Sequence, residues 1–196
     1  ALAAGFCLSE GLVESTRDIA WIGFCSETDE NCVRVGLHEE RKRIVSEQLQ
    51  GRGFLSRLRA GIDSREMIEE LTRHRKAVEE GTRIDFDQVL ECVDTFSRHQ
   101  EYYATTRGTH AVMLFDSRLD ILVKGEDVGR HNAMDKAVGA LLLEDRLQKV
   151  YLAVLSSRIS YEMIQKAVRA GIPVLISLSN PTSMAVELGL KMDMTL

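Results

Sequence analysis

Hydrophobic residues recur along the second half of the chain at alternating helical and strand spacings. Val89, Val93 and Phe96 fall at helical spacing, which predicts an amphipathic helix from Asp85 to about Tyr103. Short apolar runs and apolar stripes then alternate. They predict strands at Ala111–Phe115 and Leu119–Val123, a helix at Arg130–Glu144, a strand at Val150–Leu155, a helix at Ser160–Ala170, a strand at Pro173–Leu178 and a helix from Pro181 to about Leu190.

A hairpin followed by strand–helix–strand crossovers gives a mixed sheet with helices on both faces. The fold class predicted for residues 82–196 is therefore a three-layer α/β core. Residues 1–81 predict a smaller α+β part, with the boundary near Thr82. This part comprises a helix at Ala1–Leu12, strands at Ile19–Cys25 and Cys32–Leu37, a mobile loop over Glu39–Ala60 and a helix from Asp63 or Ser64 to Glu80.

A dense polar cluster lies where the strand ending at Lys124 gives way to the helix beginning near Arg130. Strand-to-helix switches are where open α/β sheets commonly hold ligands, and helix starts offer free N–H groups to anions. The alternative is a purely structural role, namely a capped helix with a solvated turn, in which Asp127 or Asn132 serves as the cap. The candidate residues of this cluster are Glu126, Asp127, Gly129, Arg130, His131, Asn132 and Lys136.

Two further strand-to-helix loops and one segment before the hairpin should lie at the same end of the sheet. Their hydroxyl groups and Arg158 suit phosphate oxygens, although Ser and Thr at helix starts are also ordinary N-caps. Together with the polar cluster they favour a nucleotide-type ligand. The candidate binding residues here are Ser157, Arg158, Ser160, Glu162, Ser177, Ser179 and Thr182, with Arg107, Gly108 and His110 as a fourth wall.

Charge supports a small anionic ligand rather than a nucleic acid. The 196-residue chain carries a formal net charge of −5, which argues against general nucleic-acid binding. Positive side chains nevertheless gather beside the candidate site, and a locally basic pocket suits a phosphorylated small molecule. These side chains are Arg107, His110, Lys124, Arg130, His131, Arg158 and Lys166.

The cysteines indicate neither a metal site nor a disulfide framework. Cys7, Cys25, Cys32 and Cys92 form no Cys-x-x-Cys pair, and a buried free thiol is expected for each. Cys25 and Cys32 could face each other across a hairpin, but a structural disulfide is not the favoured prediction. The chain shows no secretory signal and no membrane-spanning apolar run, so we expect a cytoplasmic protein that binds no membrane.

Two enzymatic interpretations are weaker. Ser157, His131 and Glu162 could be drawn as a hydrolase set, but the Gly-x-Ser-x-Gly elbow is absent. A zinc deaminase would share the order of elements but needs His-x-Glu and Pro-Cys-x-x-Cys. Here His110 is followed by Ala111 and Val112, and the chain has no Cys-x-x-Cys pair. No third ligand accompanies His110 and His131, so no metal is expected.

Five stretches resemble the formate dehydrogenase accessory sulfurtransferases, the FdhD/NarQ family. They are Gly5–Gly11, Gly125–Lys136, Ser157–Met163, Ala170–Val174 and Ser179–Ser183. The resemblance implies a cytidine-deaminase-like core without the deaminase metal and a dimeric cytoplasmic carrier. It further implies transfer of persulfide sulfur from a cysteine desulfurase to the molybdenum bis-guanylate cofactor (molybdopterin guanine dinucleotide) that formate dehydrogenase needs. The three loops would then hold guanine-nucleotide phosphates.

One departure from the family concerns the sulfur-bearing residue. Similar proteins carry a cysteine loop that maps to about Val45–Phe54, and this stretch has no cysteine here. A persulfide carrier needs a thiolate, so the catalytic residue is unknown from sequence. Three hypotheses follow: a sulfur carrier, a non-catalytic chaperone that binds the guanylate cofactor, and an unrelated nucleotide-binding enzyme.

Overall fold

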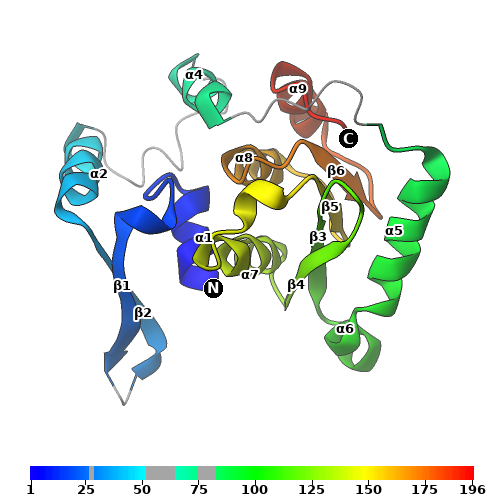
Figure 1. The fold of residues 1–196 in the computed structure, drawn as a ribbon, viewed down its shortest axis with the longest axis horizontal. Coiled ribbons are helices and arrows are strands. Elements are labelled where there is room, and N and C mark those ends of the chain that lie inside the picture. The colour runs from blue at the N-terminus through cyan, green and yellow to red at the C-terminus, as the bar shows by residue number, and fades with distance from the viewer. Residues whose placement is uncertain (27–28, 52–64, 75–82) are drawn as a thin grey trace.

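A computed structural model describes residues 1–26, 29–51, 65–74 and 83–196 (Figure 1). Its larger sheet contains β3 (His110–Phe115), β4 (Ile121–Asp127), β5 (Leu152–Leu155) and β6 (Val174–Ser177) in the order β4-β3-β5-β6. β3 runs antiparallel to both β4 and β5, whereas β5 and β6 are parallel. This confirms the predicted mixed sheet.

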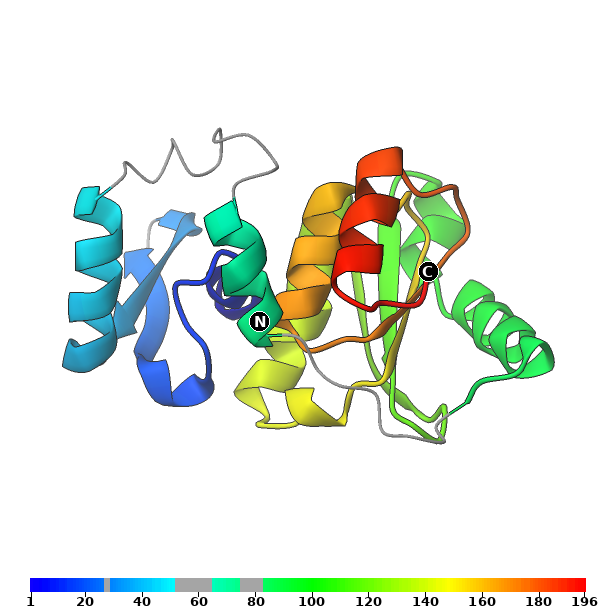
Figure 2. The ribbon, with the colours of Figure 1, turned by 90° about the horizontal axis from the view of Figure 1, so that it is seen from above.

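Both faces of this sheet are apolar, and side-chain alternation assigns each strand residue to one of them. Val112 and Leu114 of β3 belong to one buried cluster, and Met113 and Phe115 belong to another. Helices α7 (Arg130–Leu143), α8 (Tyr161–Arg169) and α9 (Ser183–Lys191) cover the first face, and α5 (Phe86–Arg98) covers the second (Figure 2).

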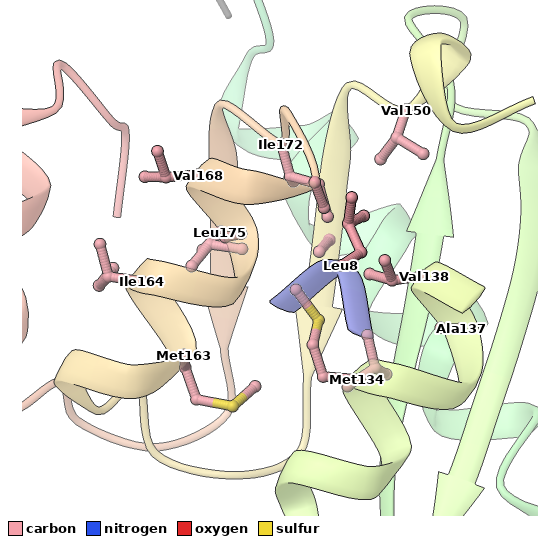
Figure 3. Close-up of a cluster of buried hydrophobic side chains, with 14 of the residues drawn as sticks. Leu8, Met134, Ala137, Val138, Val150, Met163, Ile164, Val168, Ile172 and Leu175 are labelled. Atoms are coloured by element: carbon pink, nitrogen blue, oxygen red, sulfur yellow. The ribbon is translucent and has the colours of Figure 1, made fainter. Parts of the chain in front are cut away.

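The first cluster also includes the N-terminal helix α1 (Leu2–Ser9). Leu8 of α1 packs among Met134 and Val138 of α7 and residues of α8 (Figure 3). Gly5 and Gly139 allow the close approach of α1 to α7, because a Cβ at either position would overlap backbone atoms of the other helix. Residues 1–9 therefore share a core with residues 110–192. The division into two domains stays a prediction, and Thr82 lies outside the described residues.

The N-terminal hairpin follows the predicted pattern. A 3₁₀ turn, η1 (Thr16–Asp18), is closed by a capping box between Ser15 and Asp18 and leads into β1 (Ile19–Ser26), which pairs with antiparallel β2 (Asp29–Leu37). A second 3₁₀ turn, η2 (Leu147–Lys149), precedes β5. At the C-terminal end Thr195 forms an isolated parallel bridge with Val174.

The mobile loop predicted over Glu39–Ala60 is wrong for its described part, because Glu39–Gly51 forms helix α2. Acidic residues occupy its first turn, where they stabilise the helix dipole, and Arg43 lies 3.8 Å from Glu47 at i,i+4 spacing. The buried Arg41 side chain anchors α2, since its Nε and Nη2 donate to the carbonyls of Leu12 and Gly11. Residues 52–60 lie outside the described residues.

Two other helix boundaries differ from the prediction. The helix predicted from Asp85 to Tyr103 is two helices, because His99 leaves the helical conformation and α6 (Glu101–Thr106) begins after Gln100. The helix predicted from Asp63 or Ser64 to Glu80 is seen as α4 (Arg65–His74), with its flanks outside the described residues.

The end of one strand also differs from the prediction. β4 extends to Asp127, beyond the predicted end at Val123, because Gly125 and Glu126 continue the ladder with β3.

Cys25 and Cys32 form a disulfide, so the expectation of free thiols is wrong for this pair. Their Cα atoms are 5.2 Å apart across the hairpin, which is within the range that a disulfide spans. Cys7 and Cys92 are buried free thiols, as predicted. Within the described ranges, no helix has the length and apolar character needed to cross a bilayer.

Candidate functional site

The loops after β4, β5 and β6 leave the sheet from the same end, because these three strands run in one direction around antiparallel β3. Register fixes this arrangement: His110 pairs with Asp127, and Leu155 pairs with Ser177. Asp127 and Ser179 therefore lie toward opposite sides of one sheet end, with His110 and the Ser156–Ser160 loop between them.

The β4–α7 loop is organised by the Asp127 carboxylate. Its Oδ1 accepts from the backbone N–H of Gly129 at 2.9 Å and from Asn132 Nδ2 at 3.1 Å, and Lys136 Nζ lies 2.5 Å from Oδ2. Burial raises the pKa of Asp127, but the hydrogen bonds from Lys136, Gly129 and Asn132 outweigh it and leave the pKa lowered. Lys136 also donates to the Glu126 carbonyl at 3.1 Å, so its ammonium group holds the β4–α7 loop together.

Glu126 points to the other face of the sheet. Its buried Oε1 accepts from the Tyr103 N–H at 2.7 Å and from Thr109 Oγ1 at 2.9 Å, which ties α6 to β4. Oε2 has no hydrogen-bond partner among the described residues, although Lys124 Nζ lies 3.8 Å away. Glu126 thus holds α6 in place and does not join the Asp127 loop.

Gly129 is the N-cap residue of helix α7 and Ser160 is that of helix α8, and neither makes a side-chain capping bond. The Ser160 hydroxyl instead donates to Glu162 Oε2 at 2.6 Å. The Glu162 carboxylate accepts from its own backbone N–H in the first turn of α8. Within the described residues no N-cap side chain accepts from the other first N–H groups of the two helices, which leaves these groups available to an anion. The cap predicted from Asp127 or Asn132 is therefore wrong, since Asp127 turns back onto Gly129.

His131 of α7 and Glu162 of α8 interact through their charges. Burial lowers the pKa of His131, the charges of Arg130 and Lys166 lower it further, and Glu162 opposes them. The hydrogen bond from Ser160 is the main cause that lowers the pKa of Glu162. Neutral imidazole beside an ionised carboxylate is the resulting state near neutral pH.

The β5–α8 and β6–α9 loops are bonded to each other. Ser177 Oγ lies 2.7 Å from the carbonyl oxygens of both Ser157 and Ser179, and it accepts from the Ser179 N–H at 2.9 Å. Thr182 donates its N–H to the Ile159 carbonyl at 3.0 Å and caps α9 by accepting from the Ala185 N–H. The hydroxyls of Ser177 and Thr182 therefore shape the loops.

The remaining predicted binding residues differ in whether other protein groups already engage their side chains or backbone. His110 Nδ1 lies 3.4 Å from Ser156 Oγ, while Arg107 stacks its guanidinium 5.2 Å above the Tyr103 ring. Gly108 donates its N–H to Thr106 Oγ1 at 3.2 Å. Arg158 is exposed, and no ion pair engages its guanidinium in the part of the chain that the structure describes.

The hydrolase alternative gains no geometric support. The Ser157 hydroxyl is buried and donates to the Arg158 carbonyl at 3.3 Å, and no bond to His131 occurs among the described residues. In the same residues no group of three or more His, Cys, Asp and Glu side chains is arranged to hold a metal ion.

A buried charge network beneath the site was not predicted. Lys166 Nζ lies 2.9 Å from both oxygens of Asp135, and Ser9 Oγ donates to Asp135 Oδ1 at 2.6 Å. The sequence analysis counted Lys166 among the positive side chains, but its pairing with Asp135 and Ser9 depends on the packing of α1 against α7 and α8. The detectable signal is a lysine on the apolar face of α8, between Ile164 and Ala167.

An apolar cavity of about 540 Å³ lies between α1, β2 and α2. Phe6 and Cys7 of α1, Val35 of β2 and Val45 of α2 are among its lining residues. Asn132, which also binds Asp127, is the only amide side chain that lines it in the described part of the chain.

Comparisons with known proteins agree with this architecture. A relative named sulfur carrier protein FdhD from Bordetella bronchiseptica is 32% identical over 194 residues, which are 99% of this chain and 70% of the relative. A protein of the same name from Sulfurisphaera tokodaii is 32% identical over 196 residues, 100% of this chain and 72% of that protein.

The fold also matches a crystal structure of a formate dehydrogenase accessory protein from Desulfotalea psychrophila. The TM-score is 0.70 at 21% identity, over 98% of this chain and 69% of that one, so the match shows a shared fold. A model of the FdhD/NarQ family matches residues 1–196. The chain therefore belongs to the FdhD/NarQ family.

Proposed function

We propose that this protein is a sulfur carrier for formate dehydrogenase. It takes sulfur from a cysteine desulfurase and passes it to the molybdenum bis-guanylate cofactor, which it holds as cargo. The name sulfur carrier protein FdhD, borne by relatives that match almost the whole chain, supports the carrier role. The cytidine-deaminase-like core, the homodimer and the cytoplasmic location belong to the same proposal.

One observation carries the binding half of this proposal: two helices, α7 and α8, begin without side-chain caps at the same end of the sheet. Their free N–H groups and dipoles favour a phosphate group. Arg130 is the first residue of α7, and Arg158 precedes α8 with a guanidinium that no ion pair engages among the described residues, so each can add a charge-assisted bond. A pyrophosphate flanked by these two helix starts is the ligand group that this arrangement suits.

Titration calorimetry with guanosine diphosphate and adenosine diphosphate tests the binding half. We expect the guanine nucleotide to bind more tightly, because the cargo carries guanine. Equal affinity for both nucleotides would restrict the site to generic phosphate binding, and no binding of either would refute the cargo site.

A cofactor-binding chaperone without sulfur transfer is the second candidate. It is favoured by the lack of cysteine in Val45–Phe54, whose described part is the regular helix α2. Incubation with a cysteine desulfurase and radiolabelled cysteine separates the two candidates. Label bound through a protein cysteine supports the carrier, whereas nucleotide binding without any bound label supports the chaperone.

A further inference from the structure

A sulfur carrier needs a thiol that a partner protein can reach, and this chain has four cysteines. Cys7 and Cys92 are only 7% and 3% exposed. Cys7 lies in the core shared by α1 and α7, and Cys92 lies beneath α5. Burial raises the pKa of both thiols, and nearby carboxylates raise it further, so the thiolate that accepts sulfur is disfavoured at both positions.

Cys25 and Cys32 occupy a different environment. They follow the Phe24–Val33 pair on β1 and β2, close to the turn, and both are partly exposed. Alternation along β2 directs Cys32 to the face opposite Val33 and Val35, which line the cavity beside α1. The turn-side ends of β1 and β2 extend away from α1 and α7 (Figure 1), and the neighbouring Phe24 and Val33 are 70% and 43% exposed.

We propose that Cys25 and Cys32, in their dithiol form, are the sulfur-carrying site of this protein. The inference rests on the proposed sulfur-carrier function and specifies where that function is carried out. The pair supplies the thiol chemistry that the stretch Val45–Phe54 lacks.

Loading is an exchange without net oxidation. The thiolate of one cysteine attacks the terminal sulfur of a donor persulfide, R–S–SH. A bond forms between the cysteine Sγ and that sulfur, the donor S–S bond breaks, and the donor leaves as the thiolate RS⁻. The protein then holds a cysteine persulfide on the hairpin.

The second cysteine gives this persulfide a route of release. Its thiolate attacks the Sγ of the loaded cysteine, forms the Cys25–Cys32 disulfide and expels the carried sulfur as HS⁻. The two cysteines lose two electrons, which reduce the sulfane sulfur to sulfide. The disulfide in the structure is the product of this step. Two equivalents of a thiol reductant, R′SH, restore the dithiol and leave as R′SSR′.

Labelling the whole protein with a desulfurase and radiolabelled cysteine tests the site. The protein is first reduced with a thiol and freed of it, then loaded, alkylated and digested for peptide mapping. We expect label on the peptide that contains Cys25 or Cys32 and, where the second cysteine has already resolved the persulfide, as sulfide in solution. Protein that keeps its disulfide should give at least tenfold less of both. Mapping of the unsubstituted protein requires no variant to fold.

Substitutions identify the two roles. Cys25→Ser and Cys32→Ser should each remove either the acceptor or the resolving thiol. The variant without the resolving thiol should retain its persulfide and release severalfold less sulfide than the unsubstituted protein. The double variant Cys25→Ser/Cys32→Ser should take up no label, while Cys7→Ala/Cys92→Ala, the matched control, should load normally.

The outcomes separate this inference from the function on which it rests. Label confined to Cys7 or Cys92 would overturn the hairpin site and leave the sulfur-carrier function standing. Equal loading of the reduced and the disulfide forms would also overturn the hairpin site. No label on any cysteine of the reduced protein or of either single variant, together with no labelled sulfide in solution, would refute both the site and the carrier function.

Discussion

Lys166 Nζ on α8 lies 2.9 Å from both carboxylate oxygens of Asp135 on α7, with side-chain exposures of 7% and 2%. Ser9 at the end of α1 completes the network through its bond to Asp135. Charges buried this deeply are tolerated only when paired and hydrogen-bonded. The pair therefore fixes α1, α7 and α8 to one another directly beneath the helix starts of the candidate site.

Lys166→Met should destabilise the protein by about 3–5 kcal/mol, because it leaves the Asp135 charge buried without its partner. Urea unfolding would measure the loss. Lys166→Met/Asp135→Leu should recover most of it by removing both charges. Asp94→Ala, which breaks an exposed ion pair with Arg98, should change stability by at most about 0.5 kcal/mol. Equal effects of Lys166→Met and Asp94→Ala would contradict a structural role for the buried pair.

Gly139→Ala should destabilise the protein even though alanine is the better helix former. The added methyl would overlap the backbone of Ala1 and Gly5, so α1 must move away from α7. Overpacking of this kind costs about 1–3 kcal/mol, against a gain of about 1 kcal/mol from helix propensity. Thermal unfolding would measure the difference. In the control Gly23→Ala, the added methyl meets only the Trp21 ring at 3.8 Å, an ordinary contact, and little change is expected.

Asp127→Asn should lower stability near neutral pH but not in acid. The folded-state pKa of Asp127 is lowered, so the unfolded chain takes up a proton first on acidification. The stabilisation is therefore present above the unfolded-state pKa of about 4 and is lost as the pH falls through the folded-state pKa. The stabilities of the two proteins should approach each other as the pH falls from about 4 and converge below the folded-state pKa of Asp127. A difference that persists unchanged in acid would show that Asp127 acts through shape alone.

His131 should titrate below the ordinary histidine range, and Glu162→Gln should lower its pKa further, because Glu162 is the main carboxylate that raises it. Nuclear magnetic resonance titration of the imidazole would measure both values. Since the unfolded chain binds the proton first, stability should also decrease as the pH falls below about 6.5. Glu144→Gln, near the other end of α7, is the control and should leave His131 unchanged. A raised pKa in Glu162→Gln would contradict the proposed proximity.

Arg130→Ala or Arg158→Ala should weaken guanosine diphosphate binding about tenfold, the loss expected for one hydrogen bond to a charged group. Calorimetry would measure the dissociation constants. Arg98→Ala, on α5 at the other face of the sheet, is the control and should bind normally. Unchanged affinity in both site variants would exclude these guanidiniums from the phosphate site.

The sequence by itself determined the alternation of apolar strands and amphipathic helices after residue 85. It therefore determined the mixed sheet, since strands with two apolar faces must be covered on both sides. It also named the residues of the β4–α7 loop, because a cluster of charged residues and glycine between a strand and a helix is visible locally.

The tertiary structure decided which of those polar residues form bonds that hold the loops and helices of the fold. Asp127 and Lys136 bond to each other within the β4–α7 loop, the Ser177 hydroxyl bonds to the neighbouring β5–α8 loop, and the Thr182 hydroxyl caps α9. Glu126 turns to the α6 face, whereas no ion pair engages Arg158 in the described part of the chain. It also decided the Asp135–Lys166 pair and the Cys25–Cys32 bond. Sequence spacing gives a residue its face on one helix or strand, but the approach of two elements depends on packing and register summed over the whole core.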